Sequence, residues 1–524
     1  MNINVKDFGA KGDIKTRSCA SIQEDLNVLC VNNADFNPND IGKTIIIIAQ
    51  RHRVPDLRTK IKYVTNNQNV ILESPATSEI QNRALDIIWG TDDTSEVASA
   101  IKSARPGDTV FFPPGVYCAH NLSLKSDISL VSLEGKVESR TSNILDPAIP
   151  ITLKGAVLTQ FPGDNSTFFF SDTNKVALTN VTFQGLTFDG NIGYNNKICE
   201  MFALGNANGH SSIRFLDCTI RNFSYGINTR KTKDHSSFEI SNCKFIKNGG
   251  VSVGFRGTSD IKIADCKFID CLTNIEVGPY IQGSTVQSCN RIIIERCQFS
   301  GEMGYPIHFT GERDRLAATN VTIKECTVTG PDRAWIDCNK KGSSDQIALY
   351  GVDYFSISGN VSIKGGDGGI VIQECEHGII SGNICNQNYG PGIIIEKGNF
   401  INIDANTCIK NCRRIKSEVA CGKEGDKIVT PVPGGIVVCG HDILISNNIC
   451  CDDTVPSSDA TQMYGLVISK FCKNIILGSS TAGSNFFASG LDPTRGGDIF
   501  VQAPAIYEIV ESYDQYLVMI DALR

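Results

Sequence analysis

Acidic and histidine side chains recur at one position of a phrase that the sequence repeats. The phrase places Ile or Val directly before the position in question, as in Asn274-Ile-Glu276, Pro306-Ile-His308 and Trp335-Ile-Asp337. Along the chain this position holds Asn228, Ser252, Glu276, His308, Asp337, Val371, Ile394 and Val437. If each phrase is one strand of a stacked sheet, the residue after the buried Ile or Val points outward. The polar members then form a ladder, and we predict Glu276, His308 and Asp337 as a catalytic group.

The chemistry that suits this group is glycoside hydrolysis. Glu276 and Asp337 would lie two strands apart, roughly 10 Å at about 4.8 Å per strand. This is near the upper end of the carboxyl separation in inverting glycosidases, which leaves room for a water molecule. His308 would orient the water or the substrate. The alternative is that these side chains are ordinary solvated surface. Other candidates are Glu302, Asp314, Glu396 and the cluster Gln373-Glu374-Cys-Glu376-His377, which also suits a turn, as does Asp189.

Insertions beside the same ladder should wall a groove. They cover residues 279–290, 311–319 and 339–352, and the second contains Glu312-Arg-Asp-Arg315. Its two arginines could bind the carboxylates of an acidic sugar, because guanidinium groups pair with carboxylates in a bidentate manner. The predicted substrate-binding set is Arg230, Glu312, Arg313, Arg315 and Trp335.

A second repeated phrase reveals the elements that must position these residues. Its key position holds Cys218, Cys243, Cys266, Cys297 and Cys326, and then Asn360, Asn383, Asn406 and Asn448. Successive key positions are 25, 23, 31, 29, 34, 23, 23 and 42 residues apart, so 23 residues form the bare repeat. Two strand-like phrases per repeat, with no helical periodicity between them, describe one coil of a β-solenoid. The key position then becomes a ladder of like side chains.

The N-terminal region carries an independent signal. Val5-Lys-Asp-Phe-Gly-Ala-Lys-Gly-Asp13 opens the chain, Gly90-Thr-Asp-Asp-Thr94 follows much later, and Pro106 to Tyr117 contains the pattern Val-Phe-Phe-Pro-Pro-Gly-Val-Tyr. Asp92, Asp93 or Thr94 is a plausible N-cap for a short amphipathic helix. Together these motifs resemble the opening of the pectate-lyase-3-like β-helix family. The resemblance implies a right-handed, single-stranded parallel β-helix and relatives that include bacteriophage tailspikes, alginate epimerases, and polysaccharide hydrolases and lyases. The Asp-Pro-His-Glu signature of the epimerases is absent.

The motifs divide the chain into four predicted parts. Residues 1–23 begin the β-helix, 24–89 form a small inserted β-rich module, 90–490 form the β-helix, and 491–524 form a C-terminal cap or oligomer contact. The module separates two motifs that are usually almost adjacent in the family. It could bind an oligosaccharide, serve assembly or cover the end of the solenoid. The expected fold class is therefore all-β, with one capping helix after Thr94.

Composition and charge limit the partners. A net charge of −7 argues against nucleic acid, which requires a basic face. The chain contains no apolar stretch of 18 residues, so we expect no membrane insertion. Met1 to Ala10 lacks the features of a signal peptide, which suits a virion tail or an extracellular protein whose leader has been removed. The 21 cysteines are odd in number and lack zinc-binding spacing, so we expect buried free thiols and neither a metal nor a cofactor.

We therefore predict a polysaccharide-degrading enzyme acting on a surface or capsular glycan, such as a tailspike depolymerase. A glycoside hydrolase is favoured over a lyase or an epimerase. The alternatives are a non-catalytic glycan-binding spike or adhesin and a structural fibre subunit. The resemblance to tailspikes also predicts a homotrimer. Release of reducing ends from a panel of polysaccharides would separate a hydrolase from a binder.

Overall fold

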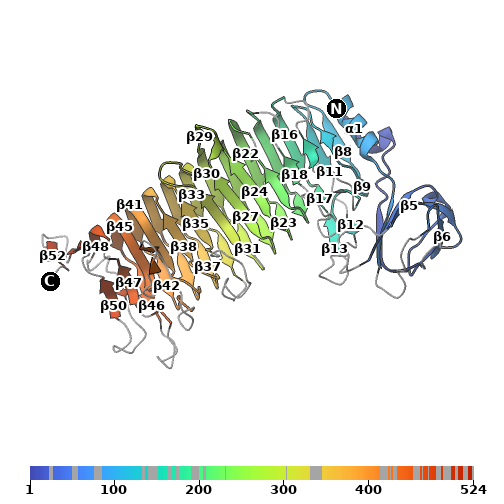
Figure 1. Ribbon diagram of the computed structural model, residues 1–524. Helices are drawn as coiled ribbons and strands as arrows, with labels where there is room; N and C mark the ends of the chain where they lie inside the picture. Colours follow the sequence, from blue (N-terminus) through green and yellow to red (C-terminus); the bar gives the residue numbers. More distant parts are fainter. Residues whose placement is uncertain are drawn as a thin grey trace. The chain divides into compact units, whose positions relative to one another are not determined.

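The computed structural model describes the chain except for residues 23–26, 50–56, 76–84, 133–135, 140–150, 162–167, 172–175, 191–199, 204–207, 230–231, 302–303, 331–344, 414–422, 425–426, 429–433, 453–460, 463, 470, 479–485, 488–496, 502–505, 511–516 and 522–524. The chain forms two compact units. Unit 1 contains residues 1–232 and 238–252, and unit 2 contains residues 233–237 and 253–524. Figure 1 labels their helices and strands.

The inserted β-rich module of unit 1 is a closed antiparallel barrel. Its strands are, in spatial order, β2 (Lys15–Ser21), β3 (Val28–Val31), β6 (Asn69–Leu72), β5 (Leu57–Val64), β4 (Thr44–Ala49) and β7 (Leu85–Gly90). Alternate side chains fill the interior, where the rings of Phe36 and Trp89 lie 4.8 Å apart. The barrel includes β2, so it starts before residue 24. These strands pair antiparallel, unlike the parallel ladders of the β-helix.

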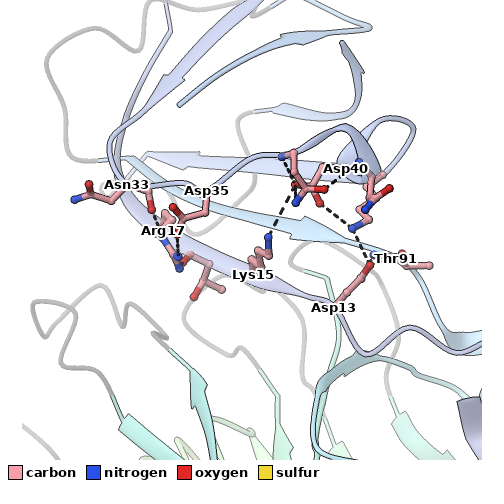
Figure 2. A network of polar contacts seen from close by, with 11 residues as sticks. Asp13, Lys15, Arg17, Asn33, Asp35, Asp40 and Thr91 are labelled. Carbon is pink, nitrogen blue, oxygen red and sulfur yellow. Dashed lines mark hydrogen bonds and ion pairs between the residues drawn. The ribbon is translucent and has the colours of Figure 1, made fainter. Parts of the chain in front are cut away.

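A polar network joins the barrel to the beginning of the β-helix (Figure 2). The Lys43 ammonium contacts Asp13 at 2.8 Å and the buried Asp40, at the end of the 3₁₀ helix η2 (Pro38–Asp40), at 2.8 Å. Asp13 also accepts hydrogen bonds from the backbone and hydroxyl of Thr91. Burial alone would raise the pKa of Asp13, but the bonds from Lys43 and Thr91 outweigh it and hold this pKa below its usual value. The carboxylate therefore joins the opening motif to the Gly90–Thr94 motif.

The predicted capping helix is α1 (Thr94–Ser103), which buries Val97, Ala100 and Ile101. Asp92 accepts a hydrogen bond from the backbone of Thr94 at 3.0 Å, as expected at the start of a helix. Asp93 instead points to the opening motif and accepts the backbone amides of residues 11 and 12 at 2.6 and 3.1 Å. Its burial raises its pKa to about 6.

The rest of unit 1 consists of parallel coils with three strands each. One ladder stacks the strands β1 (Asn2–Asn4), β8 (Thr109–Phe112), β11 (Ser129–Ser132), β16 (Thr179–Gln184) and β19 (Ser211–Leu216). The second stacks β9 (Val116–Cys118), β14 (Val157–Thr159), β17 (Thr187–Asp189), β20 (Thr219–Arg221) and β23 (Lys244–Ile246). The third stacks β10 (Leu122–Ser123), β15 (Phe168–Ser171), β18 (Glu200–Ala203) and β21 (Tyr225–Asn228). The remaining elements are η1 (Val5–Phe8) and the hairpin of β12 (Lys136–Ser139) and β13 (Ile151–Lys154).

Unit 2 repeats the same three-stranded coil. Its first ladder contains β25 (Thr258–Ala264), β30 (Cys289–Glu295), β33 (Ala318–Lys324), β36 (Val352–Ser358), β39 (Glu376–Ser381), the second halves of β41 (Ile393–Asp404) and β45 (Gly434–Ser446), β48 (Lys473–Gly478) and β51 (Ile506–Val510). The second contains β26 (Lys267–Ile269), β31 (Gln298–Ser300), β34 (Thr327–Thr329), β37 (Val361–Ile363), β40 (Ile384–Asn386), β42 (Thr407–Ile409), β46 (Ile449–Cys451) and β49 (Phe486–Phe487).

The third ladder of unit 2 positions the candidate site. It contains β27 (Thr273–Gly278), β32 (Tyr305–Thr310), β35 (Ile347–Tyr350), β38 (Ile370–Gln373), the first halves of β41 and β45, β47 (Tyr464–Ile468) and β50 (Gly497–Val501). The other strands are β22 (His235–Ser241) and β24 (Val251–Arg256), which cross the unit boundary, the hairpins β28 (Tyr280–Gln282)/β29 (Thr285–Gln287) and β43 (Lys423–Glu424)/β44 (Lys427–Ile428), and β52 (Leu517–Asp521). Parallel pairing continues through β50 and β51, beyond residue 490, and β52 turns back antiparallel on β51.

The predicted key-position ladder is confirmed. Asn360, Asn383 and Asn406 each donate from their side-chain amides to the next asparagine, ending at Asn448, at 2.9–3.0 Å. The same amides also donate to backbone carbonyls, so these buried polar groups are satisfied. In the earlier coils the position holds buried cysteines such as Cys297, whose thiol donates to a backbone carbonyl at 3.4 Å. The described cysteines are free thiols, most of them buried.

Candidate functional site

A row of outward-facing side chains crosses the third ladder of unit 2, and the backbone register fixes their order. Glu276 pairs with His308, and His308 pairs with Ala348. Two residues further along these strands, Thr310 pairs with Tyr350, Tyr350 with Gln373, and Gln373 with Glu396. These are two adjacent rows on the same face of the ladder. We call their six polar residues the polar strip: Glu276, His308, Thr310, Tyr350, Gln373 and Glu396. The prediction that Glu276 and His308 occupy neighbouring rungs is confirmed.

The predicted next rung, Asp337, is wrong. Ala348 of β35 (Ile347–Tyr350) pairs with His308 and therefore occupies that rung. An insertion in this coil duplicates the strand-like pattern, and the sequence alone does not distinguish the copies. Asp337 lies outside the described residues, as do Arg230, Trp335 and Glu302. Any catalytic or binding role of these four residues remains a prediction.

One end of the polar strip is held by ion pairing and ring stacking. Glu276 forms a salt bridge with Arg256, and both side chains are largely buried, at 18% and 16% exposed. The His308 ring stacks on Tyr305 at 4.4 Å between centroids and meets Tyr350 edge-on at 5.2 Å. Burial lowers the pKa of His308, and the Arg256 charge lowers it further although Glu276 opposes this. The imidazole is therefore neutral at neutral pH, and its Nε2 has no hydrogen-bond partner among the described residues.

A shallow pocket of about 580 Å³ lies beside the middle of the polar strip. Its lining residues are Gly311, Glu312, Arg313, Asp314, Tyr350, Gln373 and Glu374. Backbone hydrogen bonds of 3.1 and 3.0 Å between Glu312 and Arg315 fold the loop into a tight turn. The pocket thus combines a loop that the sequence predicted with two members of the polar strip.

The loop arginines do not stand free in this pocket. Arg313 forms an ion pair with Glu376, and its backbone amide donates to Glu374 at 3.3 Å. Arg315 lies 3.9 Å from Asp314, in a pair that is exposed on both sides. Glu374 also contacts Lys397 at 2.7 Å. Lys397 lowers the pKa of Glu374 and the Arg313 amide lowers it further, although partial burial opposes both. Glu374 is therefore ionised at neutral pH.

Glu396 has the opposite environment at the far end of the polar strip. Burial raises its pKa, the nearby charge of Asp345 raises it further, and Lys397 opposes both. No described residue donates a hydrogen bond to its carboxyl group. Asp345 is 4% exposed and accepts hydrogen bonds from the Tyr350 hydroxyl at 2.9 Å and from the Gly368 amide at 3.1 Å. Neighbouring coils therefore carry one carboxyl whose pKa is lowered and one whose pKa is raised.

Sequence reasoning found part of this arrangement. The sequence suggests Glu374 and Glu396 as secondary candidates. Glu374 belongs to the Gln373–His377 cluster, and Glu396 lies two residues beyond Ile394, which holds the outward position of its phrase. Asp345 was missed because it lies in an insertion, outside every repeated phrase. A signal that could have found it is the short run Asp345-Gln-Ile-Ala-Leu-Tyr350, whose consecutive apolar residues suit a buried strand.

Among the described residues, no group of three or more His, Cys, Asp or Glu side chains is arranged to hold a metal ion. No helix in the described part of the chain is long and apolar enough to cross a membrane.

Comparison with known proteins assigns the family. The model of the right-handed β-helix region matches residues 164–314 and 254–450, which together cover more than half of the chain. The chain belongs to the right-handed β-helix family. This agrees with the expected fold class and with the parallel ladders of both units. The β-helix family spans several activities, so membership does not choose a reaction. No curated protein matches the sequence.

Solved structures with a similar fold come from several sources. The tailspike of E. coli bacteriophage HK620, solved with a pentasaccharide, is 12% identical over 80% of this chain and 77% of its own, with a TM-score of 0.46. PfbA, a surface adhesin of Streptococcus pneumoniae, is 12% identical over 82% of this chain and 95% of its own, with a TM-score of 0.43. The mannuronan C-5 epimerase A-module AlgE4 of Azotobacter vinelandii is 12% identical over 81% of this chain and 96% of its own, with a TM-score of 0.39. At these values none of them assigns an activity.

Proposed function

We propose that this β-helix protein is a glycoside hydrolase that cleaves a surface or capsular glycan bound along the polar strip. Glu396 is the general acid and Glu374 is the ionised carboxylate that activates water. The observation that carries the proposal is the opposite direction of the two pKa shifts on adjacent coils. Environments that push the pKa values of two carboxyl groups apart are the usual basis of acid and base roles in glycosidases.

The proposed reaction assigns one proton transfer to each of these two carboxyl groups. Glu396 gives its proton to the glycosidic oxygen as the bond to the anomeric carbon breaks. A water molecule attacks that carbon, and Glu374 accepts the proton that the water loses. The two products are a new reducing end and a free hydroxyl. Asp345 acts as a positioning residue, because its charge helps to raise the pKa of Glu396 and its carboxylate holds the Tyr350 hydroxyl.

Glu276 and His308 take a binding role in this proposal, although the sequence suggests them as catalytic. Glu276 lies at the opposite end of the polar strip from Glu374 and Glu396, and Arg256 holds its carboxylate in a salt bridge. The stacked rings of Tyr305 and His308 suit contact with a sugar. The polar strip therefore divides into a binding end and a reacting end.

The test is release of reducing ends from a panel of capsular and plant polysaccharides. Glu396→Gln and Glu374→Gln should each lower turnover by about 10²–10⁴-fold, because an amide keeps the shape but cannot exchange the proton. Glu325→Gln is the matched control: it is an exposed glutamate at a corner with φ 56°, close to the φ 54° of Glu374, in an earlier coil. Retention of a glycan without cleavage would instead support the glycan-binding spike or adhesin. An unsaturated product would support a lyase.

Homotrimerisation and a place on a virion tail remain predictions. Light scattering at about three times the chain mass of 56.8 kDa would support the trimer, and a mass of 56.8 kDa would contradict it.

A further inference from the structure

We infer that the polar strip and its pocket accept a neutral glycan and discriminate against sugars that carry carboxylate or sulfate groups. This inference rests on the proposed function of the same site and adds the class of substrate. It also reverses the expectation that the arginines of the 311–319 loop bind an acidic sugar. The basis is the state of every basic side chain that the structure describes along the site.

The binding end has its guanidinium already engaged. Arg256 and Glu276 form a salt bridge in which both partners are largely buried. An acidic sugar could take Arg256 only by displacing Glu276, and the displaced carboxylate would then be buried without its partner. Breaking a buried pair in this way is strongly unfavourable. Arg256 therefore balances Glu276 and is not available to a second anion.

The pocket repeats this arrangement. Arg313 is paired with Glu376, which also accepts a hydrogen bond from Asn399 at 3.0 Å. Lys397 is paired with Glu374 at 2.7 Å. Arg315 has only the long, exposed contact with Asp314, and such surface pairs contribute little. Each basic side chain that the structure describes along the site thus lies beside a carboxylate of the same site.

Carboxyl groups remain in excess after this pairing. Glu312 lines the pocket and forms no ion pair with a described basic residue. Asp345 adds a buried negative charge close enough to affect the pKa of Glu396. Among the described residues of the site, negative charges therefore outnumber positive ones, and like charges facing each other across an interface weaken binding and reject the wrong partner. A bound uronate would also raise the pKa of Glu374 and work against its ionised state.

The same groups suit a neutral sugar. The Arg256–Glu276 pair places a guanidinium donor beside a carboxylate acceptor, and these are the two kinds of group that bind neighbouring sugar hydroxyls. The Gln373 side-chain amide offers a donor and an acceptor at the pocket floor. Hydroxyl recognition of this kind needs no net charge on the protein.

The experiment compares each uronate-containing polysaccharide with its own carboxyl-reduced form, together with neutral polysaccharides, by affinity electrophoresis with the full chain. Retention of a neutral or reduced polymer should be at least about tenfold stronger than that of the acidic form. The difference should narrow at high ionic strength, because salt screens the repulsion. Preference for the acidic forms would overturn the inference.

A charge-release variant makes the test specific to the site. Glu376→Gln frees Arg313, and it should strengthen retention of the acidic form by about tenfold with little change for the neutral form. The pair of Glu376 with Arg313 is partly exposed, so the variant should fold, and Glu325→Gln is the control. Unchanged acidic binding in a folded Glu376→Gln variant would contradict the inference.

The outcomes separate the two proposals. Retention of a neutral glycan without release of reducing ends contradicts only the hydrolase. Cleavage with a preference for acidic polymers contradicts only the neutral-glycan inference. Failure to retain any polymer of the panel contradicts both.

Discussion

The coils of unit 2 that carry cysteine at the key position and those that carry asparagine support opposite ends of the polar strip. The intervals from Cys266, Cys297 and Cys326 to the next key position are 31, 29 and 34 residues. These coils supply Glu276, His308 and the pocket loop. Asn360, Asn383 and Asn406 lie 23 residues apart and belong to the coils that supply Gln373, Glu374 and Glu396.

Hydrogen bonding distinguishes the two ladders. Each asparagine amide reaches both the next amide and a backbone carbonyl at about 3 Å, including across the 42-residue interval from Asn406 to Asn448. A cysteine fills a similar volume but makes only a weak hydrogen bond, so it does not impose the same register between coils. The asparagine ladder therefore helps to fix the register of the coils that hold Glu374 and Glu396.

The largest expected effect is a different change in kcat and KM for variants at the two ends of the polar strip. Glu396→Gln should lower kcat by about 10²–10⁴-fold with little change in KM, because it removes the proton donor. His308→Ala should raise KM severalfold and lower kcat by less than about tenfold, because it removes a ring that contacts bound sugar. Steady-state rates on a cleaved polysaccharide measure both. A comparable loss of kcat in His308→Ala would move the chemistry to the cysteine-supported end.

A smaller effect concerns the stability of the supporting coils. Asn383→Ala should lower the free energy of unfolding by about 1–3 kcal/mol, because the backbone amide and side chain of Asn360 both lose their acceptor. Cys297→Ala should cost about 1 kcal/mol, close to the loss of one small buried group.

Urea titrations followed by circular dichroism would measure both variants, with exposed Glu325→Gln as the reference. Equal losses of unfolding free energy in the two variants would mean that the asparagine ladder adds nothing beyond packing.

The sequence was informative wherever the repeat is regular. The 23-residue spacing predicted the coils, the key-position ladder and the adjacency of Glu276 and His308, because register follows directly from period. It failed at Asp337, where an insertion carries a second strand-like phrase and Ala348 takes the rung. It also could not show that Glu376, 63 residues from Arg313, neutralises that arginine. Nor could it show that Asp345 raises the pKa of Glu396, since both effects depend on distance and burial.

The smallest expected effect is a shift in the pH profile of the asparagine-supported end. In the proposed mechanism Glu396 donates a proton, so we expect activity below its pKa and a loss of activity as pH rises through that value. The charge of Asp345 helps to raise this pKa, after burial itself. Asp345→Asn removes the charge, lowers the pKa of Glu396 and should move the alkaline limb of the kcat profile to lower pH. Tyr350→Phe is the matched control, because it removes the 2.9 Å hydrogen bond to Asp345 but leaves the charge in place.

The raised pKa of Glu396 also predicts the sign of a stability effect. Above the ordinary pKa of a glutamate the unfolded chain ionises first, so the folded state loses stability as pH rises until Glu396 itself is ionised. Glu396→Gln should remove that part of the pH dependence, and Asp345→Asn should reduce it. An alkaline limb that moves in neither Asp345→Asn nor Tyr350→Phe would show that Asp345 does not control the acid. Glu396 would then owe its raised pKa to burial alone.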